Sequence, residues 1–193
     1  MIGIKWMERI KMVNKQQIFT VPNLLSFFRL LLIPVIVWLY CGKEAYGMAL
    51  AVLILSGLTD VADGIIARKY NLVSDFGKAL DPIADMLTQI ATMGCLLSRF
   101  PYMWLPLGIL VVKEVFTGAM SLYAVKKSGE VKGADWHGKL CTVLLYAAMG
   151  LHMLWSGIPV LFSKVLMLLC VAVMLLSGVL YWYRNFKQIK GYT

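Results

Sequence analysis

Charged residues are scarce for the length of the chain, and this scarcity decides the class of protein. Only 15% of the 193 residues are Asp, Glu, Lys or Arg, whereas 60% are hydrophobic. A soluble domain carries about 25% charged residues, so the composition excludes an ordinary soluble protein. The long apolar runs indicate an integral membrane protein instead. The net charge of +9 is spread between these runs, which indicates topology signals and lipid-headgroup contacts rather than a nucleic-acid surface.

Cysteine and histidine are also scarce, which argues against disulfide and zinc scaffolds. The four cysteines form no CxxC pair, and we expect buried apolar thiols at Cys41, Cys95, Cys141 and Cys170. His137 and His152 have no carboxylate or cysteine partner at ligand spacing. We therefore expect both histidines to be structural. The sequence also lacks an internal repeat and a low-complexity tract.

Six apolar segments predict an all-α integral membrane protein with six transmembrane helices. Each has about 19 to 24 residues, enough to cross a bilayer of about 30 Å at 1.5 Å per residue. The expected spans are 22–41, 46–67, 77–98, 102–125, 138–156 and 160–183. We expect one six-helix domain at 21–184, preceded by a short interfacial basic segment at 1–20 and followed by a cytoplasmic tail at 185–193. A cleaved signal peptide is the competing interpretation of the start, but the apolar run there is long and contains Arg29.

Basic residues predict the orientation of these spans. Fourteen fall on one predicted side of the membrane, and only three, Lys43, Arg99 and Lys164, fall on the other. Loops rich in Lys and Arg stay in the cytoplasm. The pattern therefore places both termini, and the loop between the second and third spans, on the cytoplasmic side.

Acidic residues are concentrated in one stretch, which holds five carboxylates within 26 residues. Asp60 and Asp63 are spaced i,i+3, and Asp81 and Asp85 are spaced i,i+4, so each pair shares one helix face. Like charges at that spacing repel unless a cation lies between them, and a hard divalent ion takes oxygen ligands. Two such faces turned toward each other would hold one or two metal ions. We expect Asp75 to be a solvated loop charge. A merely acidic loop is the alternative, although charge near membrane depth is costly.

Small residues and one arginine accompany the acids. From Asp60 to Asp85 the pattern is D-x2-D-G-x2-A-R-x8-G-x3-D-x3-D, with Gly64, Ala67, Arg68 and Gly77 at the non-acidic positions. It resembles the signature of the CDP-alcohol phosphotransferases, also called CDP-alcohol phosphatidyltransferases of class I. These membrane enzymes move a phosphatidyl or similar group from a CDP-activated donor. The start of the first span, with Asn23, Ser26 and Arg29, is also similar to that family.

The resemblance implies a metal-dependent enzyme. Asp60, Asp63 and Asp81 would be the main ligands of Mg²⁺ or Mn²⁺, with two ions expected, and Asp85 would complete the site and act as general base. The donor, CDP-diacylglycerol, would contact Asp60, Asp63, Gly64, Ala67, Arg68, Gly77 and Asp81. An alcohol hydroxyl would attack its lipid-bearing phosphorus and release CMP. The family also implies a homodimer in a bacterial-type inner membrane, with a cytoplasmic active site and no nucleic acid partner.

Within the family, the chain is most similar to the bacterial phosphatidylglycerophosphate synthases, which implies glycerol 3-phosphate as acceptor. Its phosphate would be held by Lys113 and Lys139, while Asn23 and Arg29 would support the donor or the acidic cluster. Structural alternatives exist for each cation: snorkelling for Arg29, a buried pair with Glu114 for Lys113, and a positive-inside flank for Lys139. The sequence departs from the pattern at Met86, Lys113 and Cys141. Each departure removes or softens positive charge expected near the acceptor.

Three other hypotheses remain at this point. A cardiolipin synthase of the CDP-diacylglycerol type, or another phosphatidyltransferase, would share the motif and differ in acceptor. An ion-coupled transporter would place its acids near the bilayer midplane on broken helices, whereas here they fall at the cytoplasmic ends of two spans. A catalytically dead scaffold is disfavoured because every position of the motif is present.

Overall fold

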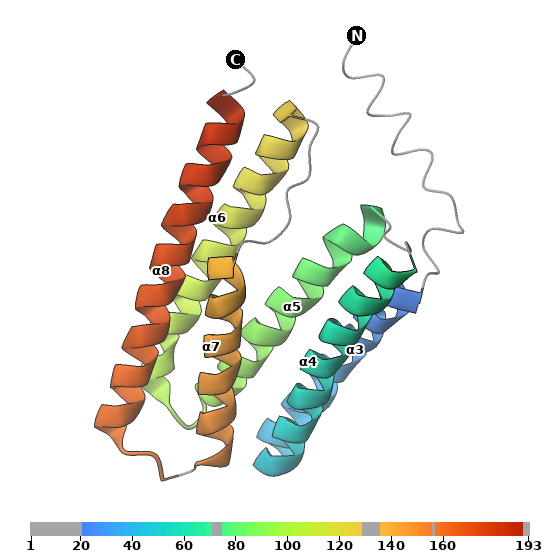
Figure 1. The fold of residues 1–193 in the computed structure, drawn as a ribbon. Helices are drawn as coiled ribbons and strands as arrows, with labels where there is room; N and C mark the ends of the chain where they lie inside the picture. The colour runs from blue at the N-terminus through green and yellow to red at the C-terminus, as the bar shows by residue number, and fades with distance from the viewer. Residues whose placement is uncertain (1–20, 71–74, 129–135, 156, 191–193) are drawn as a thin grey trace. The chain divides into compact units, whose positions relative to one another are not determined.

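The computed structural model describes residues 21–70, 75–128, 136–155 and 157–190, and this part of the chain is helical, without a strand (Figure 1). The predicted interfacial segment 1–20 lies outside the described residues. A short π-helical segment, Trp38–Gly42, follows the first helix, and a 3₁₀ turn, Pro101–Met103, precedes the fourth. The long helices are α3 (Val21–Val37), α4 (Tyr46–Lys69), α5 (Asp75–Leu96), α6 (Trp104–Ser128), α7 (Trp136–Leu154) and α8 (Val160–Lys190).

A helix lies at each of the six predicted spans, but only part of the six-span prediction is confirmed. Four segments are long and apolar enough to cross a membrane: Asn23–Gly42, Tyr46–Ile66, Pro101–Met120 and Val160–Lys187. Helices α5 and α7 do not reach that standard. Helix α5 begins at Asp75, which we expected in a loop, and it carries three acids in its first half. Many large apolar side chains are exposed along the described helices, as expected for helices that face lipid.

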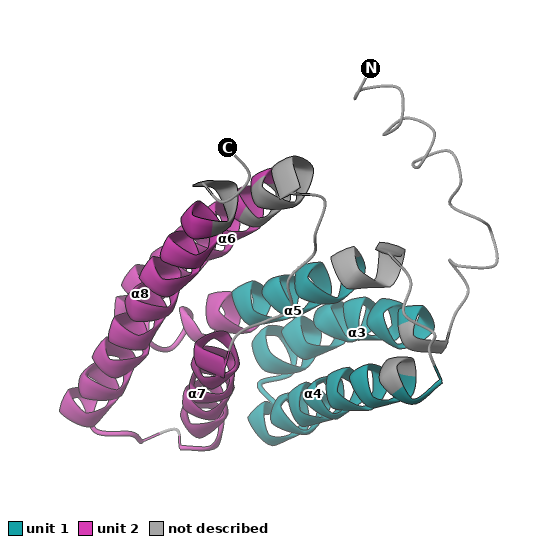
Figure 2. Ribbon diagram, turned by 45° about the horizontal axis from the view of Figure 1, so that its top comes forward, with its two compact units in different colours: residues 1–91 teal, residues 92–193 magenta. Residues whose placement is uncertain are grey.

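The chain divides into two compact units, residues 1–91 and 92–193, with the boundary inside α5 (Figure 2). In the first unit α3 and α4 pack against each other along their length. The short connection between them makes the two helices antiparallel. Ile36 and Leu53 are buried in this unit, and Ala49 has no exposed surface. A small side chain at a helix contact lets two backbones approach closely.

In the second unit α8 packs against both α6 and α7, and α6 and α8 run in the same direction (Figure 1). The buried side chains are rich in Met and Leu, with Met103, Leu110, Leu145, Met149 and Met174 almost fully enclosed. Methionine adapts its shape to irregular gaps between helices. The unit is therefore held by an apolar core of its own.

Hydrogen bonds join three helix ends within the second unit. Tyr102 donates to Ser163 Oγ at 2.6 Å, and Ser163 Oγ lies 2.6 Å from His152 Nε2. His152 Nδ1 lies 2.7 Å from the carbonyl oxygen of Ala148. A carbonyl only accepts, so Nδ1 carries the proton and Nε2 accepts from the serine hydroxyl. His152 is fully buried and structural, as predicted.

His137 is likewise structural. Its Nδ1 lies 3.2 Å from Ser177 Oγ, and its ring packs edge-on against Tyr181 at 4.7 Å between centroids. All four cysteines are free thiols, in agreement with the prediction. Three of them are buried, but Cys41 is exposed, so the expectation of burial was wrong there. Cys41 lies in the π-helical segment that ends the first span, where a side chain reaches the surface.

Candidate active site

A polar stripe runs along one face of α3, an otherwise apolar helix. Asn23, Ser26 and Arg29 are spaced i, i+3 and i+6, which places them on one side of the helix. All three are buried, with at most 1% of each residue exposed. A fully buried polar or charged side chain is costly unless it is paired. The stripe therefore requires polar partners within the first unit.

Arg29 finds its partners on α4. Its Nη2 donates to Asp63 Oδ2 at 2.8 Å, and its Nη1 forms an ion pair with Asp60 Oδ1. The two acids differ in surroundings, because the Asp63 side chain is 4% exposed and that of Asp60 is 47% exposed. The predicted pairing of Asp60 and Asp63 on one helix face is thus confirmed. The cation that lies between them is a guanidinium from the neighbouring helix.

Asp81 joins the same cluster from α5. The Ser26 hydroxyl donates to Asp81 Oδ1, which links the polar stripe of α3 to the third helix of the unit. Asp81 is also close enough to Arg29 and to Asp60 to interact electrostatically with both. Asp63 likewise interacts with Asp81 and with Asp60. We call Asp60, Asp63, Asp81 and Arg29 the acidic cluster. It assembles three sequence-predicted acids and one predicted supporting residue.

Asp85 lies one turn beyond Asp81 on α5 and is partly exposed. Its Oδ2 accepts a hydrogen bond from Gln89 Nε2 at 2.8 Å. Gln89 is itself buried, so its amide holds one oxygen of the carboxylate in a fixed position. A buried side chain that binds a carboxylate in this way fixes its orientation.

The donor set of the acidic cluster fits a hard divalent ion, because it consists of carboxylate oxygens. Within the described residues, however, no group of three or more His, Cys, Asp or Glu side chains stands ready to hold a metal ion. Arg29 and Ser26 engage the oxygens instead. The residue types therefore suit a metal, while in this arrangement an arginine and a serine contact the carboxylate oxygens.

The remaining motif positions lie on the same two helices. Gly64 follows Asp63 on α4, and Ala67 and Arg68 lie in the last turns of that helix. Gly77 lies near the start of α5, one turn before Asp81. The side chains of Ala67 and Arg68, and the surroundings of Gly77, are outside the described part of the structure. Their predicted contacts with the nucleotide stay predictions.

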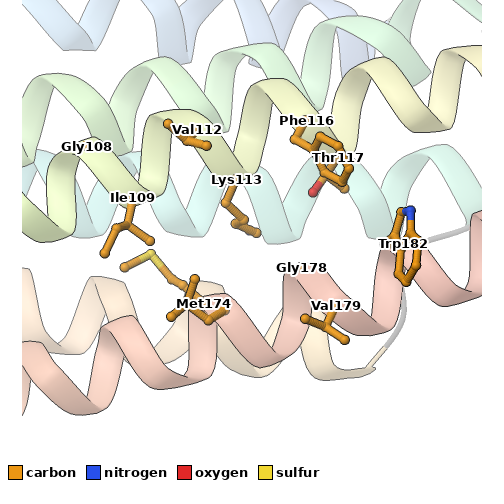
Figure 3. A pocket seen from close by; sticks show the side chains of 11 residues that line it. Gly108, Ile109, Val112, Lys113, Phe116, Thr117, Met174, Gly178, Val179 and Trp182 are labelled. Carbon is orange, nitrogen blue, oxygen red and sulfur yellow. The ribbon is translucent and has the colours of Figure 1, made fainter.

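The predicted acceptor residues lie in the second unit. Lys113 on α6 forms an ion pair with its neighbour Glu114 at 2.5 Å, as the structural alternative expected. It also lines an apolar cavity of about 440 Å³ between α6 and α8 (Figure 3). Gly178 of α8 leaves space beside its aliphatic stem. Lys139 is exposed near the start of α7. A role of either lysine in holding a phosphate stays a prediction.

Two contacts of the site were not predicted from the sequence. Ser26 was part of the motif at the start of the first span but had no partner assigned, and Gln89 was not considered. Both carry a signal in the sequence. Ser26 lies one turn from Arg29 on the polar stripe, and Gln89 follows Asp85 at i+4, the spacing at which a glutamine reaches an aspartate on the same helix.

Comparison with known proteins gives a consistent result. The family model described as CDP-alcohol phosphatidyltransferase matches residues 19–176. A protein of Rickettsia typhi named CDP-diacylglycerol--glycerol-3-phosphate 3-phosphatidyltransferase is 31% identical over 89% of this chain and 97% of its own length. A probable phosphatidylglycerophosphate synthase of Mycobacterium tuberculosis is 29% identical over 95% of this chain and 90% of its own. A cardiolipin synthase (CMP-forming) of Streptomyces coelicolor is 33% identical over 75% of this chain and 70% of its own.

Proposed function

Because the chain belongs to the CDP-alcohol phosphatidyltransferase family, we propose that it transfers a phosphatidyl group from CDP-diacylglycerol to glycerol 3-phosphate. The products are phosphatidylglycerophosphate and CMP. The observation that carries this assignment is the near full-length similarity to relatives named for that reaction. The acidic cluster supports it, since its four residues belong to the segments that resemble the family.

The proposed chemistry is a substitution at phosphorus. The acceptor hydroxyl oxygen forms a bond to the phosphorus that carries the diacylglycerol, and the bond from this phosphorus to the oxygen of CMP breaks. Asp85 accepts the proton of the hydroxyl. The Gln89 amide donates to Asp85 Oδ2 and so holds the carboxylate in place. The rest of phosphoryl transfer is positioning and electrostatic stabilisation.

A divalent ion, Mg²⁺ or Mn²⁺, belongs to the proposal and would be held by Asp60, Asp63 and Asp81, with Asp85 completing the site; two such ions are expected. When bound, such an ion neutralises charge on the pyrophosphate and on the leaving oxygen. The chain's own residues supply the carboxylate oxygens and keep them together in the first unit. Gly64 and Gly77 allow close approach of the nucleotide, and Arg68 is suited to its phosphates.

A second acceptor has specific support. The Streptomyces coelicolor relative, at 33% identity, is named a cardiolipin synthase, and that reaction uses the same donor with phosphatidylglycerol as acceptor. Met86 and Cys141 stand where the family commonly has lysine, and Lys113 lacks the bidentate fork of the customary arginine, so these positions favour an acceptor that is less anionic or larger than glycerol 3-phosphate. Phosphatidylglycerol is the alternative acceptor on these grounds.

We further propose six membrane spans, a cytoplasmic acidic cluster and a homodimer. The uneven distribution of basic residues supports the orientation, and the family resemblance supports the dimer. In this proposal helices α5 and α7 cross the membrane too, although they do not reach the standard of length and apolar character that the other four helices meet.

An acceptor panel tests the function. Purified protein receives CDP-diacylglycerol with glycerol 3-phosphate, phosphatidylglycerol, serine or inositol, and the lipid product is identified by mass spectrometry. We expect phosphatidylglycerophosphate with glycerol 3-phosphate only. Cardiolipin as the main product would establish the alternative acceptor. CMP release with none of them would overturn both acceptors, and no CMP release under any condition would overturn the enzyme assignment.

Asp85→Asn is the matched control for this assay. The variant keeps the size of the side chain and its contact with Gln89 but cannot accept the proton. We expect CMP release to fall by a factor of at least about 10², the lower end of the usual contribution of a general base, with the thermal midpoint unchanged. Normal turnover by this variant would remove Asp85 from the chemistry.

A further inference from the structure

Arg29 is the one charged side chain among the described residues that is both nearly fully buried and placed between two carboxylates. It is 1% exposed, and its charge lies well inside a helix apolar enough to cross a membrane. Removing such a charge from water costs several kcal/mol unless it is paired. Its ion pairs with Asp60 and Asp63 offset part of that cost, and its positive charge reduces the repulsion between the two acids.

The guanidinium is held by charge more than by a complete set of hydrogen bonds. Nη2 makes a well-formed bond to Asp63 at 2.8 Å. Nε and Nη1 are buried without a hydrogen-bond partner, although Nη1 is in ion-pair contact with Asp60. An arginine whose five donors are all satisfied is difficult to displace. Arg29 is far from that condition.

The charge of the acidic cluster leaves room for a further cation. Asp60, Asp63 and Asp81 carry three negative charges when ionised and Arg29 carries one positive charge, so the cluster has a net charge of −2. That charge attracts a divalent ion. The oxygens it would need on Asp60 and Asp63 are, however, the ones that Arg29 engages.

We propose that Arg29 is an internal counter-ion of the acidic cluster that competes with the divalent ion for Asp60 and Asp63. In the absence of metal it holds the two carboxylates together and keeps α3 and α4 packed. When the ion binds, Arg29 gives up these contacts. The inference rests on the proposed function only in taking a divalent ion as the ligand of these acids, and it assigns Arg29 a positioning role rather than a catalytic one.

Mn²⁺ binding to Arg29→Gln tests the competition directly. Electron paramagnetic resonance measures free Mn²⁺ over a titration of the purified full chain, with no substrate present. We expect Arg29→Gln to bind Mn²⁺ about tenfold more tightly than the unaltered protein, the change that follows when ~1.4 kcal/mol of competition is removed. Arg29→Lys keeps a cation but lacks the fork that reaches two carboxylates, so we expect an intermediate affinity.

Thermal unfolding supplies an independent readout. In excess chelator Arg29→Gln leaves Asp60 and Asp63 without their counter-ion, so its midpoint falls below that of the unaltered protein. Saturating Mn²⁺ replaces the missing charge and narrows the difference. Lys43→Gln is the control, because it removes one positive charge just beyond the far end of the first span, outside the acidic cluster. It should change neither the affinity nor the response to chelator.

The outcomes separate the inference from the function on which it rests. Tighter Mn²⁺ binding by Arg29→Gln supports the competition. Equal or weaker binding by that variant overturns it and leaves the metal site in place. Absence of Mn²⁺ binding in both proteins overturns the metal site and the competition together. Asp63→Asn shows that the ion measured is bound at this cluster, since its affinity should fall.

Discussion

Ser26 shows how much a single hydroxyl contributes at the scale of residues. It is fully buried and donates to Asp81, and through Asp81 it connects α3 to α5 within the first unit. Arg29, one turn further on, connects the same helix to α4. Two side chains of one helix therefore orient the acids of two others. A substitution of Ser26 or Arg29 therefore changes the positions of the carboxylates even though no aspartate is replaced.

Ser26→Ala should destabilise the protein by about 1.5–3 kcal/mol, the usual contribution of a hydrogen bond to a charged group. Asp81 then loses the hydroxyl donor that Ser26 supplies. The thermal midpoint in chelator measures the loss. Thr59→Ala is the matched control, because its hydroxyl bonds only to the Ser56 carbonyl of its own helix at 2.7 Å. An equal loss in both variants would contradict a specific role for Ser26.

The sequence predicted the acids of the site and named Arg29 as support for the donor or for the acidic cluster, but it did not predict that Arg29 lies between Asp60 and Asp63. The i,i+3 spacing of Asp60 and Asp63 was enough to place both on one face, because helix geometry is local. Their encounter with Arg29 depends on how α3 is rotated against α4, which no local spacing determines. The polar stripe of Asn23, Ser26 and Arg29 contains that information. The rotation of α3 against α4 can be inferred from this stripe once it is known that the stripe is buried and does not face the membrane surface.

At the scale of elements, the positions of the helices were predicted from the apolar runs, and their ends less well. Helix α8 continues to Lys190 instead of ending near residue 183. The apolar run ends there, but a helix does not need an apolar sequence once it has left the membrane. Arg184 and Lys187 are acceptable to a helix at the membrane surface. Hydropathy predicts which part of a helix is buried in lipid. The helix itself can continue beyond that part, because its backbone hydrogen bonds do not depend on an apolar sequence.

Gly138 of α7 lies against the Tyr181 side chain of α8. A Cβ atom built there would meet the Tyr181 hydroxyl and lie 3.1 Å from two of its ring carbons. Overpacking of this kind costs about 1–3 kcal/mol, which exceeds the ~1 kcal/mol that Ala gains over Gly in a helix. We therefore expect Gly138→Ala to lower the thermal midpoint.

Gly118→Ala is the comparison for that measurement. Gly118 lies inside α6 with nothing within 4 Å of the added carbon, so only the helical preference for alanine acts there. The midpoint should stay the same or rise. A Gly138→Ala protein as stable as Gly118→Ala would mean that Tyr181 moves aside without cost.

At the scale of the whole molecule, the exposed large apolar side chains and the four apolar helices identify a membrane protein, as the composition predicted. The orientation in the membrane rests on the distribution of charge alone. Cys41 offers a way to measure it. It is the exposed cysteine of the four, and it lies at the predicted non-cytoplasmic end of the first span.

We expect a membrane-impermeant maleimide to label Cys41 in intact bacterial spheroplasts that express the protein. The other three thiols are buried and should react only after denaturation. Cys41→Ser is the control and should abolish the labelling. Labelling that requires lysis of the membrane would place this loop in the cytoplasm, and the acidic cluster at the other end of α3 and α4 would then face outward.

The serine shared by Tyr102 and His152 has a consequence for how the second unit opens. Its hydroxyl donates to one partner and accepts from the other, so a separation at this point strands three polar groups simultaneously. A partial separation of the helices at this point leaves the same three polar groups without their partners. We therefore expect the beginnings of α6 and α8 and the end of α7 to separate as one cooperative event, with Ser163 as the group that joins them.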